Sequence, residues 1–305
     1  MVTVKSLKMY FKHPIRLLVR LGRYSFLKYM NDEQYLTMLF KDATGYSLNL
    51  ANPKTFNEKL QWQKINIHKQ EYTRLVDKYE VKQWISEHIG EQYVIPTLGV
   101  WDSYNEIDFE TLPEQFVLKC THDSGGLVIC REKAKLNKRE MKKRFTKALK
   151  RNYFWGGREW PYKNVKPRIL AEQYIEDNES DKGLTDYKFF CFNGEAKLLY
   201  VSRGLENHAT AEISFYDMNG NKMPFSRNDY RPIKGKITFP DNFKEMVNTA
   251  NKLAHLIGAP FVRIDLYSIS GKIKFSEVTF FPCGGMLPFE PKEWDRELGN
   301  WINLP

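Results

Sequence analysis

The stretch FVRIDLYSISGKIKFSEVTFFPCGGM, residues 261–286, constrains the fold more than any other part of the chain. Its alternation of apolar and polar residues predicts two antiparallel strands joined by a turn at residues 268–271. Arg263 and Asp265 share one face of the first strand, and Glu277 and Thr279 share one face of the second. With an even pairing offset, Asp265 and Glu277 become near neighbours on the same face of a sheet.

Two carboxylates at this separation repel each other unless a cation or a shared proton lies between them. Carboxylate oxygens are the ligands that magnesium prefers, and magnesium commonly bridges to nucleotide phosphates. Arg263 would add positive charge for the same phosphates. The alternative is a solvated hairpin face with incidental charges, and the hairpin alone leaves both interpretations open.

Length and charge bound the remaining possibilities. At 305 residues and 42% hydrophobic content, the chain can bury a full core in one large domain or in two to three lobes. A formal net charge of +10 indicates an anionic partner, such as a nucleotide, an acidic polysaccharide, a membrane surface or nucleic acid. An excess charge that only improves solubility is the alternative.

The cysteines and the apolar runs indicate a compartment. The four cysteines form no CxxC motif and have no histidine at ligand spacing, which argues against zinc and favours a reducing compartment. The N-terminus lacks a continuous apolar segment of the signal-peptide type, and no run reaches transmembrane length. We therefore expect a cytoplasmic protein.

Residues 1–29 interleave seven Lys or Arg residues with apolar ones and contain no acidic residue. This pattern predicts a basic amphipathic helix that is interrupted near Pro14. Such a helix could lie on the anionic inner face of a membrane, or pack on the core with its basic face in solvent.

Helical and strand patterns then follow one another along the chain. Residues 52–84 are helical, with capping-box spacing between Thr55 and Glu58, and a helix ends at Gly90. Helices are also expected at residues 133–151 and 243–258. A break at Pro96 interrupts a strand at residues 93–101, residues 168–177 form a strand with an acidic end, and residues 152–162 form an aromatic loop.

Residues 116–131, FVLKCTHDSGGLVICR, predict a strand, a glycine-containing loop and a second strand. The glycines let backbone N–H groups approach an anion closely. The absence of a GK[ST] sequence excludes a P-loop, so the pattern favours a flap over nucleotide phosphates or a plain tight hairpin. A further hairpin, with Lys188 on its first strand, turns at residues 193–194.

Seven phrases, taken in order, resemble the ATP-grasp superfamily and, within it, the TupA-like branch associated with bacterial surface polysaccharide and teichuronopeptide synthesis. They are NPKTFNEKLQW, VDKYEVKQWI, IGEQYVIPTLGVWDS, LPEQFVLKCTHDSGG, GREWPYKNVKPRILAEQYIED, DYKFFCFNGE and RIDLYSISGKIKFSEVTF. The resemblance runs from about Tyr35 to the C-terminus. It implies an ATP-grasp fold in which two α+β lobes hold ATP, preceded by a helical region.

The resemblance also implies roles for single residues. ATP would be bound by Lys78, Lys119, Ser124, Gly125, Gly126, Glu172, Gln173, Tyr174, Ile175, Asp177 and Lys188. Asp265, Glu277 and Thr279 would hold magnesium, and Arg263, Lys188 and Lys119 would act in catalysis. The chain departs from the family pattern twice, because Thr279 replaces a common Asn and Asp123 follows His122 where the branch commonly has Gly.

The resemblance implies an ATP-dependent carboxylate–amine ligase with ATP and Mg²⁺ as cofactors, which forms an amide through an acyl phosphate. The substrates would be a uronic acid and an amino acid or amine of capsule or exopolysaccharide biosynthesis. The expected divisions are residues 1–95 (basic helical region), 96–177 (lid lobe) and 178–305 (core lobe). A glycosyltransferase and a basic nucleic-acid-binding protein are the alternatives, although no DxD motif supports the first and the second leaves Asp265 and Glu277 unexplained.

Overall fold

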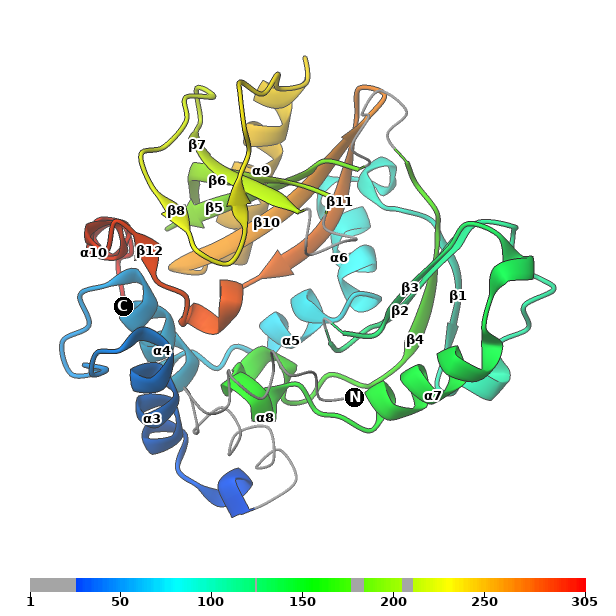
Figure 1. Cartoon of the computed structure of the whole chain (residues 1–305), viewed down its shortest axis with the longest axis horizontal. Coiled ribbons are helices and arrows are strands. Elements are labelled where there is room, and N and C mark those ends of the chain that lie inside the picture. The colour runs from blue at the N-terminus through cyan, green and yellow to red at the C-terminus, as the bar shows by residue number, and fades with distance from the viewer. Residues whose placement is uncertain (1–25, 124, 177–183, 205–210) are drawn as a thin grey trace.

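The computed structural model describes residues 26–123, 125–176, 184–204 and 211–305. These residues form two large β-sheets, a short two-stranded sheet, and helices that pack on and beside them (Figure 1). The basic helix expected at residues 1–29 lies outside the described residues except for the 3-10 helix Phe26–Tyr29. Within the described ranges, none of the helices combines the length and apolarity that a membrane span requires.

The first sheet, here called the lid sheet, has four antiparallel strands in the order β1-β4-β2-β3. These strands are β1 (Thr97–Trp101), β4 (Ile169–Gln173), β2 (Phe116–Cys120) and β3 (Leu127–Cys130). Helix α7 (Lys138–Leu149) covers one face with its apolar residues Met141, Phe145 and Ala148, which join the buried cluster around Phe116 and Leu118.

The second sheet, here called the core sheet, has the order β11-β10-β5-β6-β7-β9, and all its pairings are antiparallel except the short β7–β9 pair. Its strands are β5 (Asp186–Phe192), β6 (Glu195–Arg203), β7 (Glu212–Asp217), β9 (Arg231–Pro232), β10 (Phe261–Ile269) and β11 (Lys272–Thr279). Strands β8 (Ser226–Arg227) and β12 (Phe289–Glu290) pair beside it.

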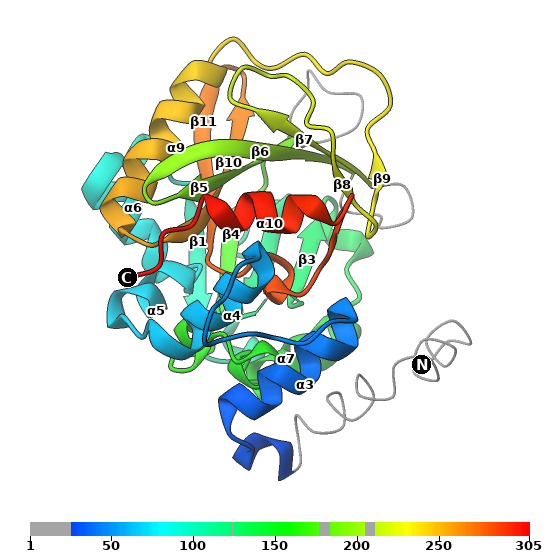
Figure 2. The same cartoon turned by 90° about the vertical axis from the view of Figure 1, so that its left-hand side faces the viewer.

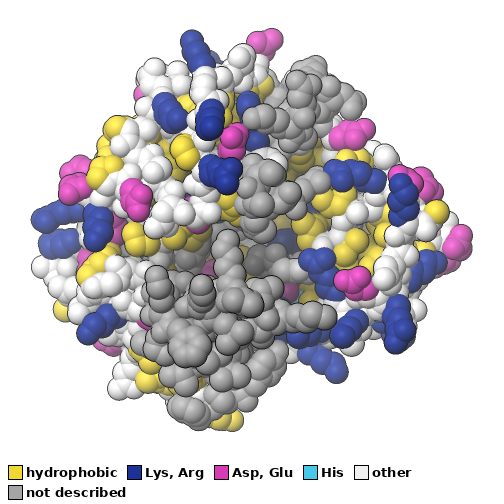
Figure 3. Space-filling model, in the orientation of Figure 1, with side chains coloured by type: hydrophobic (Ala, Val, Ile, Leu, Met, Phe, Trp, Pro, Cys, Tyr) yellow, Lys and Arg dark blue, Asp and Glu magenta, His cyan; other side chains and the backbone are white. Residues whose placement is uncertain are grey.

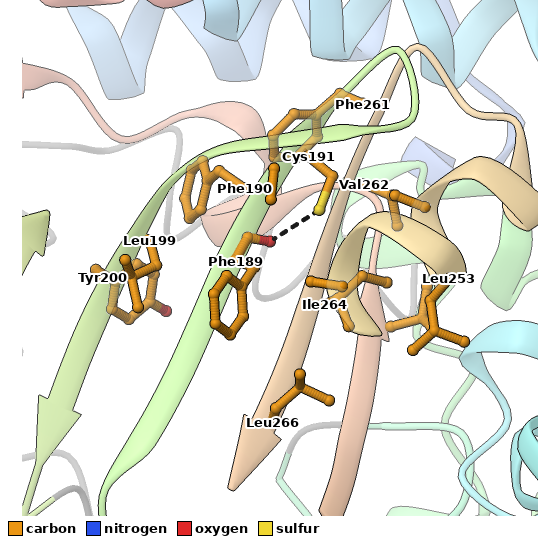
Figure 4. Close-up of a cluster of buried hydrophobic side chains, with 14 of the residues drawn as sticks. Phe189, Phe190, Cys191, Leu199, Tyr200, Leu253, Phe261, Val262, Ile264 and Leu266 are labelled. Atoms are coloured by element: carbon orange, nitrogen blue, oxygen red, sulfur yellow. Dashed lines mark hydrogen bonds between the residues drawn. The ribbon is translucent and has the colours of Figure 1, made fainter. Parts of the chain in front are cut away.

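Helix α9 (Phe243–Ile257) covers one face of the core sheet. Val262, Ile264 and Leu266 of β10 point toward Leu253 of this helix (Figure 4). The helix ends at Gly258, whose φ of 59° is the left-handed conformation that glycine adopts most readily. The alternation of β10 therefore places its apolar residues under α9 and its charged residues on the opposite face.

The opposite face of the core sheet is divided into two parts. At one end, Phe190, Phe192 and Phe261 pack around Phe56 of helix α4, with ring centroids 4.8–6.2 Å from that of Phe56. At the other end, the same face carries charged side chains. The aromatic end thus anchors the N-terminal helices, while the charged end remains for the site described below.

Helices α3 (Asp32–Thr44), α4 (Phe56–Asn66), α5 (Gln70–Val76) and α10 (Glu293–Asn300) lie below the core sheet, and α6 (Glu80–Ile89) lies at its side (Figure 2). The buried carboxylate of Asp295 in α10 accepts hydrogen bonds from the backbone N–H of Asn57 (3.0 Å), its Nδ2 (3.0 Å) and the hydroxyl of Tyr46 (2.7 Å). This network ties the C-terminal helix to α4.

Most local expectations are confirmed, including both hairpins and the capping box of Thr55 and Glu58. The turns contain residues with positive φ, at Asn193–Gly194 and at Ser270–Gly271. The helix expected at residues 133–151 is shorter, because a 3-10 turn precedes α7 and Asn137 caps it. The expectation of a plain loop at residues 152–162 is wrong: the segment contains α8 (Phe154–Gly157) and the 3-10 helix Trp160–Tyr162. The expected strand before Pro96 is also absent from this described segment, where β1 begins at Thr97.

We predict that Asp295→Ala lowers the free energy of unfolding by about 3 kcal/mol, because buried donors lose their acceptor. Urea denaturation of the full chain measures this change. The matched control is Glu297→Ala on an exposed position of the same helix, which should change the stability by less than about 0.5 kcal/mol. Equal effects of the two substitutions would contradict the role given to Asp295.

Candidate functional site

A cavity of about 610 Å³ lies between the lid sheet and the core sheet. Its apolar wall includes Ile95, Val117, Leu127, Ile129, Ile175 and Leu184. Its charged wall includes Lys78, Lys119, Arg131, Glu172, Glu176, Asp186, Lys188 and Glu277. A cavity that combines an apolar wall with convergent charges is the usual form of a ligand-binding site.

A row of charged residues crosses three strands on the core-sheet side. Lys188 of β5 pairs with Asp265 of β10, which pairs in turn with Glu277 of β11. The two carboxylates are therefore directly opposite each other, as the sequence predicted. A bulge between Asp265 and Leu266 shifts the register by one residue relative to the turn end of the hairpin, so that Glu277 and not Ser276 lies opposite Asp265.

Arg263 lies between the two carboxylates. Its Nε and Nη2 each donate to Asp265 at 2.7 Å, and Nη2 also donates to Oε1 of Glu277 at 2.7 Å. Nη1 donates to the hydroxyl of Tyr200 at 3.3 Å. The sequence left open a cation or a shared proton between the carboxylates and favoured magnesium as the cation. In the structure a side chain of the same strand, Arg263, takes this position and holds the hairpin face together.

Lys188 is the second cation of this cluster. Its ammonium group donates to Oδ2 of Asp265 at 2.6 Å and also contacts the carboxylate of Asp186. Burial alone would lower the pKa of Lys188, but the charges of Asp186 and Asp265 outweigh burial and raise it well above its usual value. Lys188 therefore stays protonated at neutral pH and presents a positive charge to the cavity.

The wall position of Glu277 differs from the deep position of Asp265. Asp265 is completely buried, whereas the Glu277 side chain is 38% exposed and lines the cavity. Burial would raise the pKa of Glu277, but Arg263 and then Lys188 lower it to about 2. Glu277 is thus an ionised carboxylate at the surface of the cavity.

Asp186 lines the same cavity and was missed by the sequence reasoning. Asp186 is only 7% exposed, and its buried Oδ1 has no hydrogen-bond partner among the described residues. Burial raises the pKa of Asp186 to about 6 against the opposing effect of Lys188. An unsatisfied buried acceptor beside a cavity is costly unless a ligand hydroxyl, a proton or a cation meets it. Its position two residues before Lys188, on the same strand face, was the available signal.

The lid sheet contributes a second buried charge cluster. Glu172 of β4 receives Lys119 of β2 at one carboxylate oxygen and Lys82 of α6 at the other, the latter at 2.7 Å. Although burial would raise the pKa of Glu172, Lys119 and Lys82 lower it below its usual range. Both Lys119 and Glu172 line the cavity, and so do the next three residues expected to bind ATP, Gln173, Tyr174 and Ile175.

The glycine loop between β2 and β3 is closed by Asp123. The carboxylate of Asp123 accepts from the backbone N–H of Gly125 (3.2 Å) and Gly126 (2.9 Å), and its carbonyl accepts from Nζ of Lys78 (2.7 Å). Asp123 thus occupies the N–H groups that were expected to face phosphate. Gly126 lines the cavity and Gly125 does not, while Ser124 and Asp177 lie outside the described residues.

The predicted metal ligands occupy unlike positions. Both oxygens of Asp265 are hydrogen-bonded to Arg263 or Lys188, and Thr279 is bonded to Arg263 and Glu277. Arg263, Asp265 and Thr279 do not line the cavity as the described residues form it. Within the described ranges, no three or more His, Cys, Asp or Glu side chains are grouped as a ready metal site. Glu277 and Asp186 are the carboxylates that face the cavity.

Comparison with known proteins identifies relatives. A family model described as TupA-like ATP-grasp matches residues 58–303. Similar solved structures include a D-alanine–D-alanine ligase from Bacillus anthracis (19% identity, TM-score 0.39, 70% of this chain and 57% of that one). The corresponding ligase from Helicobacter pylori has 15% identity, a TM-score of 0.40 and coverages of 76% and 60%. A RimK domain ATP-grasp protein from Sphaerobacter thermophilus has 10% identity, a TM-score of 0.41 and coverages of 76% and 69%.

The chain spans less than two thirds of the length of these D-alanine–D-alanine ligases. No match was found among curated proteins.

We predict that Arg263→Gln lowers the free energy of unfolding by about 3–5 kcal/mol, because the carboxylates of Asp265 and Glu277 lose the cation between them. Adding Asp265→Asn should recover part of the loss, since only one ionised carboxylate then remains at the pair. Urea denaturation at pH 7 measures both variants. Wild-type stability of the single variant would show that Arg263 does not hold the hairpin face.

The same contact has a pH signature. Because Arg263 lowers the pKa of Glu277, the interaction contributes stability above about pH 4.5 that is lost as the pH falls toward 2. In Arg263→Gln the carboxyl carbon of Glu277, followed by NMR, should titrate at higher pH than in the wild type. An unchanged midpoint would contradict the assignment.

Proposed function

The chain belongs to the TupA-like ATP-grasp family, and from this premise we propose that it is an ATP-dependent ligase that joins a carboxylate to an amine. The observation that carries the proposal is the composition of the cavity between the two sheets. Three lysines, Lys78 from the turn between α5 and α6, Lys119 from β2 and Lys188 from β5, converge on it beside an apolar wall. Cations suit the phosphates of a nucleotide, and the apolar wall suits its base.

The cavity contains no activated nucleophile among its described lining residues. Cys120 is the cysteine on its wall, and burial raises the pKa of this thiol to about 12, so it stays protonated at neutral pH. Phosphoryl transfer requires little covalent participation by the protein, because positioning and charge stabilisation carry the reaction. The cavity is therefore better suited to direct transfer between bound substrates than to a covalent enzyme intermediate.

Magnesium is implied by the fold family, and the residues present can accommodate it. The unpaired buried oxygen of Asp186 and the cavity-facing carboxylate of Glu277 offer hard oxygen ligands. Bound there, magnesium would neutralise charge on the nucleotide phosphates. Asp265 and Thr279 stay predicted ligands, and Asp265 could take part only after Arg263 or Lys188 releases one of its oxygens.

In the proposed reaction, a carboxylate oxygen of the acid attacks the γ-phosphorus of ATP, and the bond between that phosphorus and ADP breaks. The amine then attacks the carbonyl carbon of the acyl phosphate, loses a proton and expels phosphate to leave an amide. Lys119 and Lys188 would hold the phosphates, and Arg263 would stabilise charge from behind the row of carboxylates. The lid sheet would exclude water, which otherwise hydrolyses the acyl phosphate.

We further propose that the acid is a uronic acid and the amine an amino acid or simple amine, within bacterial cell-surface polysaccharide biosynthesis in the cytoplasm. This substrate class rests on the resemblance of the sequence phrases to the TupA-like branch. Sequence-specific nucleic-acid binding is not expected, because a basic surface gives salt-sensitive and sequence-independent binding.

We predict that Lys119→Ala weakens binding of a non-hydrolysable ATP analogue tenfold or more, as about 1.5–3 kcal/mol is expected for a charged hydrogen bond. Isothermal titration calorimetry measures the affinity. Lys82→Ala is the matched control, because Lys82 pairs with the same Glu172 and does not line the cavity. Equal losses in both variants would indicate that Lys119 acts only through Glu172.

The reaction is tested with purified protein, ATP, Mg²⁺ and a panel of uronic acids with amines. With the correct acid, hydroxylamine should trap a hydroxamate, and acid labelled with ¹⁸O in its carboxylate should deliver one label to released phosphate. Asp265→Asn combined with Glu277→Gln should abolish ADP formation. Retention of all the label in the organic product would overturn the acyl phosphate mechanism.

A further inference from the structure

The net positive charge of this chain comes from two segments. Residues 133–151 contain ten Lys or Arg residues and one acidic residue, Glu140, for a net charge of +9. Residues 1–29 contribute +7, so the rest of the chain carries −6 of the total of +10. The basic character is therefore local, and within the described residues it centres on helix α7.

The two sides of α7 are sharply different. Met141, Phe145 and Ala148 are buried in the lid core. The exposed side carries Lys138, Arg139, Glu140, Lys142, Lys143, Arg144, Thr146 and Lys147, and no apolar residue. Figure 3 shows Lys and Arg side chains gathered along the lower right edge, where Figure 1 places α7. We call this exposed side the α7 basic face.

Acidic side chains of the described residues do not neutralise the cations at the centre of the α7 basic face. Arg139, Lys142, Lys143 and Lys147 form no ion pair with any described residue. Like charges four residues apart, at Arg139 with Lys143 and at Lys143 with Lys147, also destabilise a helix. The repulsion persists in the free protein, and an external anionic surface would relieve it.

We propose that the α7 basic face docks on the surface of an anionic lipid bilayer. The face lacks aromatic residues, which would stack on sugars or on unpaired bases, and so is unlike a polysaccharide or single-strand groove. Its cations are mainly lysines, which suit a diffuse anionic plane because they act as point charges without a fixed fork of donors. Its apolar residues are already buried, so the contact is electrostatic and superficial.

The position of α7 leaves the cavity free. The helix packs on the side of the lid sheet that holds Phe116 and Leu118, whereas Val117 and Lys119 of the same strand line the cavity on the other side. Nη2 of Arg144 donates to the carbonyl of Gly125 at 3.1 Å, so the helix also touches the glycine loop. A bilayer bound to α7 would therefore hold the enzyme at a surface without covering its site.

Vesicle sedimentation of the full chain tests this inference, independently of the proposed reaction. Two kinds of vesicle are compared: neutral vesicles of phosphatidylcholine alone, and anionic vesicles of phosphatidylcholine with about 40% phosphatidylglycerol. The variant replaces Arg139, Lys142, Lys143 and Lys147 with Gln. A matched control replaces four exposed lysines of the core lobe with Gln, and its net charge therefore equals that of the α7 variant. These lysines are Lys234, Lys236, Lys244 and Lys252.

The wild type should bind the anionic vesicles only. The α7 variant should lose about a hundredfold or more in partitioning, because each charge near such a surface contributes about fivefold, while the control should lose much less. Equal losses in the two variants, or unchanged binding of the α7 variant, would overturn the proposal. Binding of the wild type to polyuronate or RNA but not to vesicles, lost in the α7 variant, would assign the face to a soluble polyanion instead. Circular dichroism verifies that each variant is folded.

Discussion

The guanidinium of Arg263 is the contact on which the candidate site depends. It lies between two carboxylates that the hairpin register places directly opposite each other, at Asp265 and Glu277. Buried charges are tolerated when each has a partner at hydrogen-bond distance, and Arg263 with Lys188 supplies those partners. The cluster therefore keeps its ionised groups in a water-poor position without a bound ligand.

The two ends of one face of the core sheet have different roles. Phenylalanines at one end of β5 and β10 hold helix α4, and through Asp295 that helix holds the C-terminal helix. The other end of the same strands carries the charged cluster. Because packing fixes the aromatic end, the strands that bear Lys188 and Asp265 have little freedom to move. Rigid strands position charged groups more exactly than loops do, which suits phosphoryl transfer.

Two acidic side chains of the protein accept hydrogen bonds from groups that were expected to bind phosphate. Asp123 accepts the N–H groups of the glycine loop, and Glu172 accepts both Lys119 and Lys82. In the proposed function, a nucleotide bound at these places would exchange an internal anion for phosphate, so the net gain in binding free energy would be smaller than the contacts alone suggest. The departure from the family pattern at Asp123 thus has a structural consequence: its carboxylate closes the glycine loop.

Turn residues and alternation act over a few positions, so the sequence alone predicted the hairpins and the capping box. Its seven phrases, taken in order, indicated the family and with it the α+β class. The sequence placed Asp265 and Glu277 on one face only for an even pairing offset, and the bulge between Asp265 and Leu266, which shifts the register set by the turn, puts them opposite each other. The sequence could not show that Arg263 lies between the two carboxylates, or that Glu172 pairs with two lysines. These contacts join side chains from different strands and helices, and only folding brings them together. The unpaired oxygen of Asp186 is likewise a feature of the folded cluster, in which Lys188 contacts its other oxygen. Tertiary structure alone decided which charges face the cavity and which lie behind it.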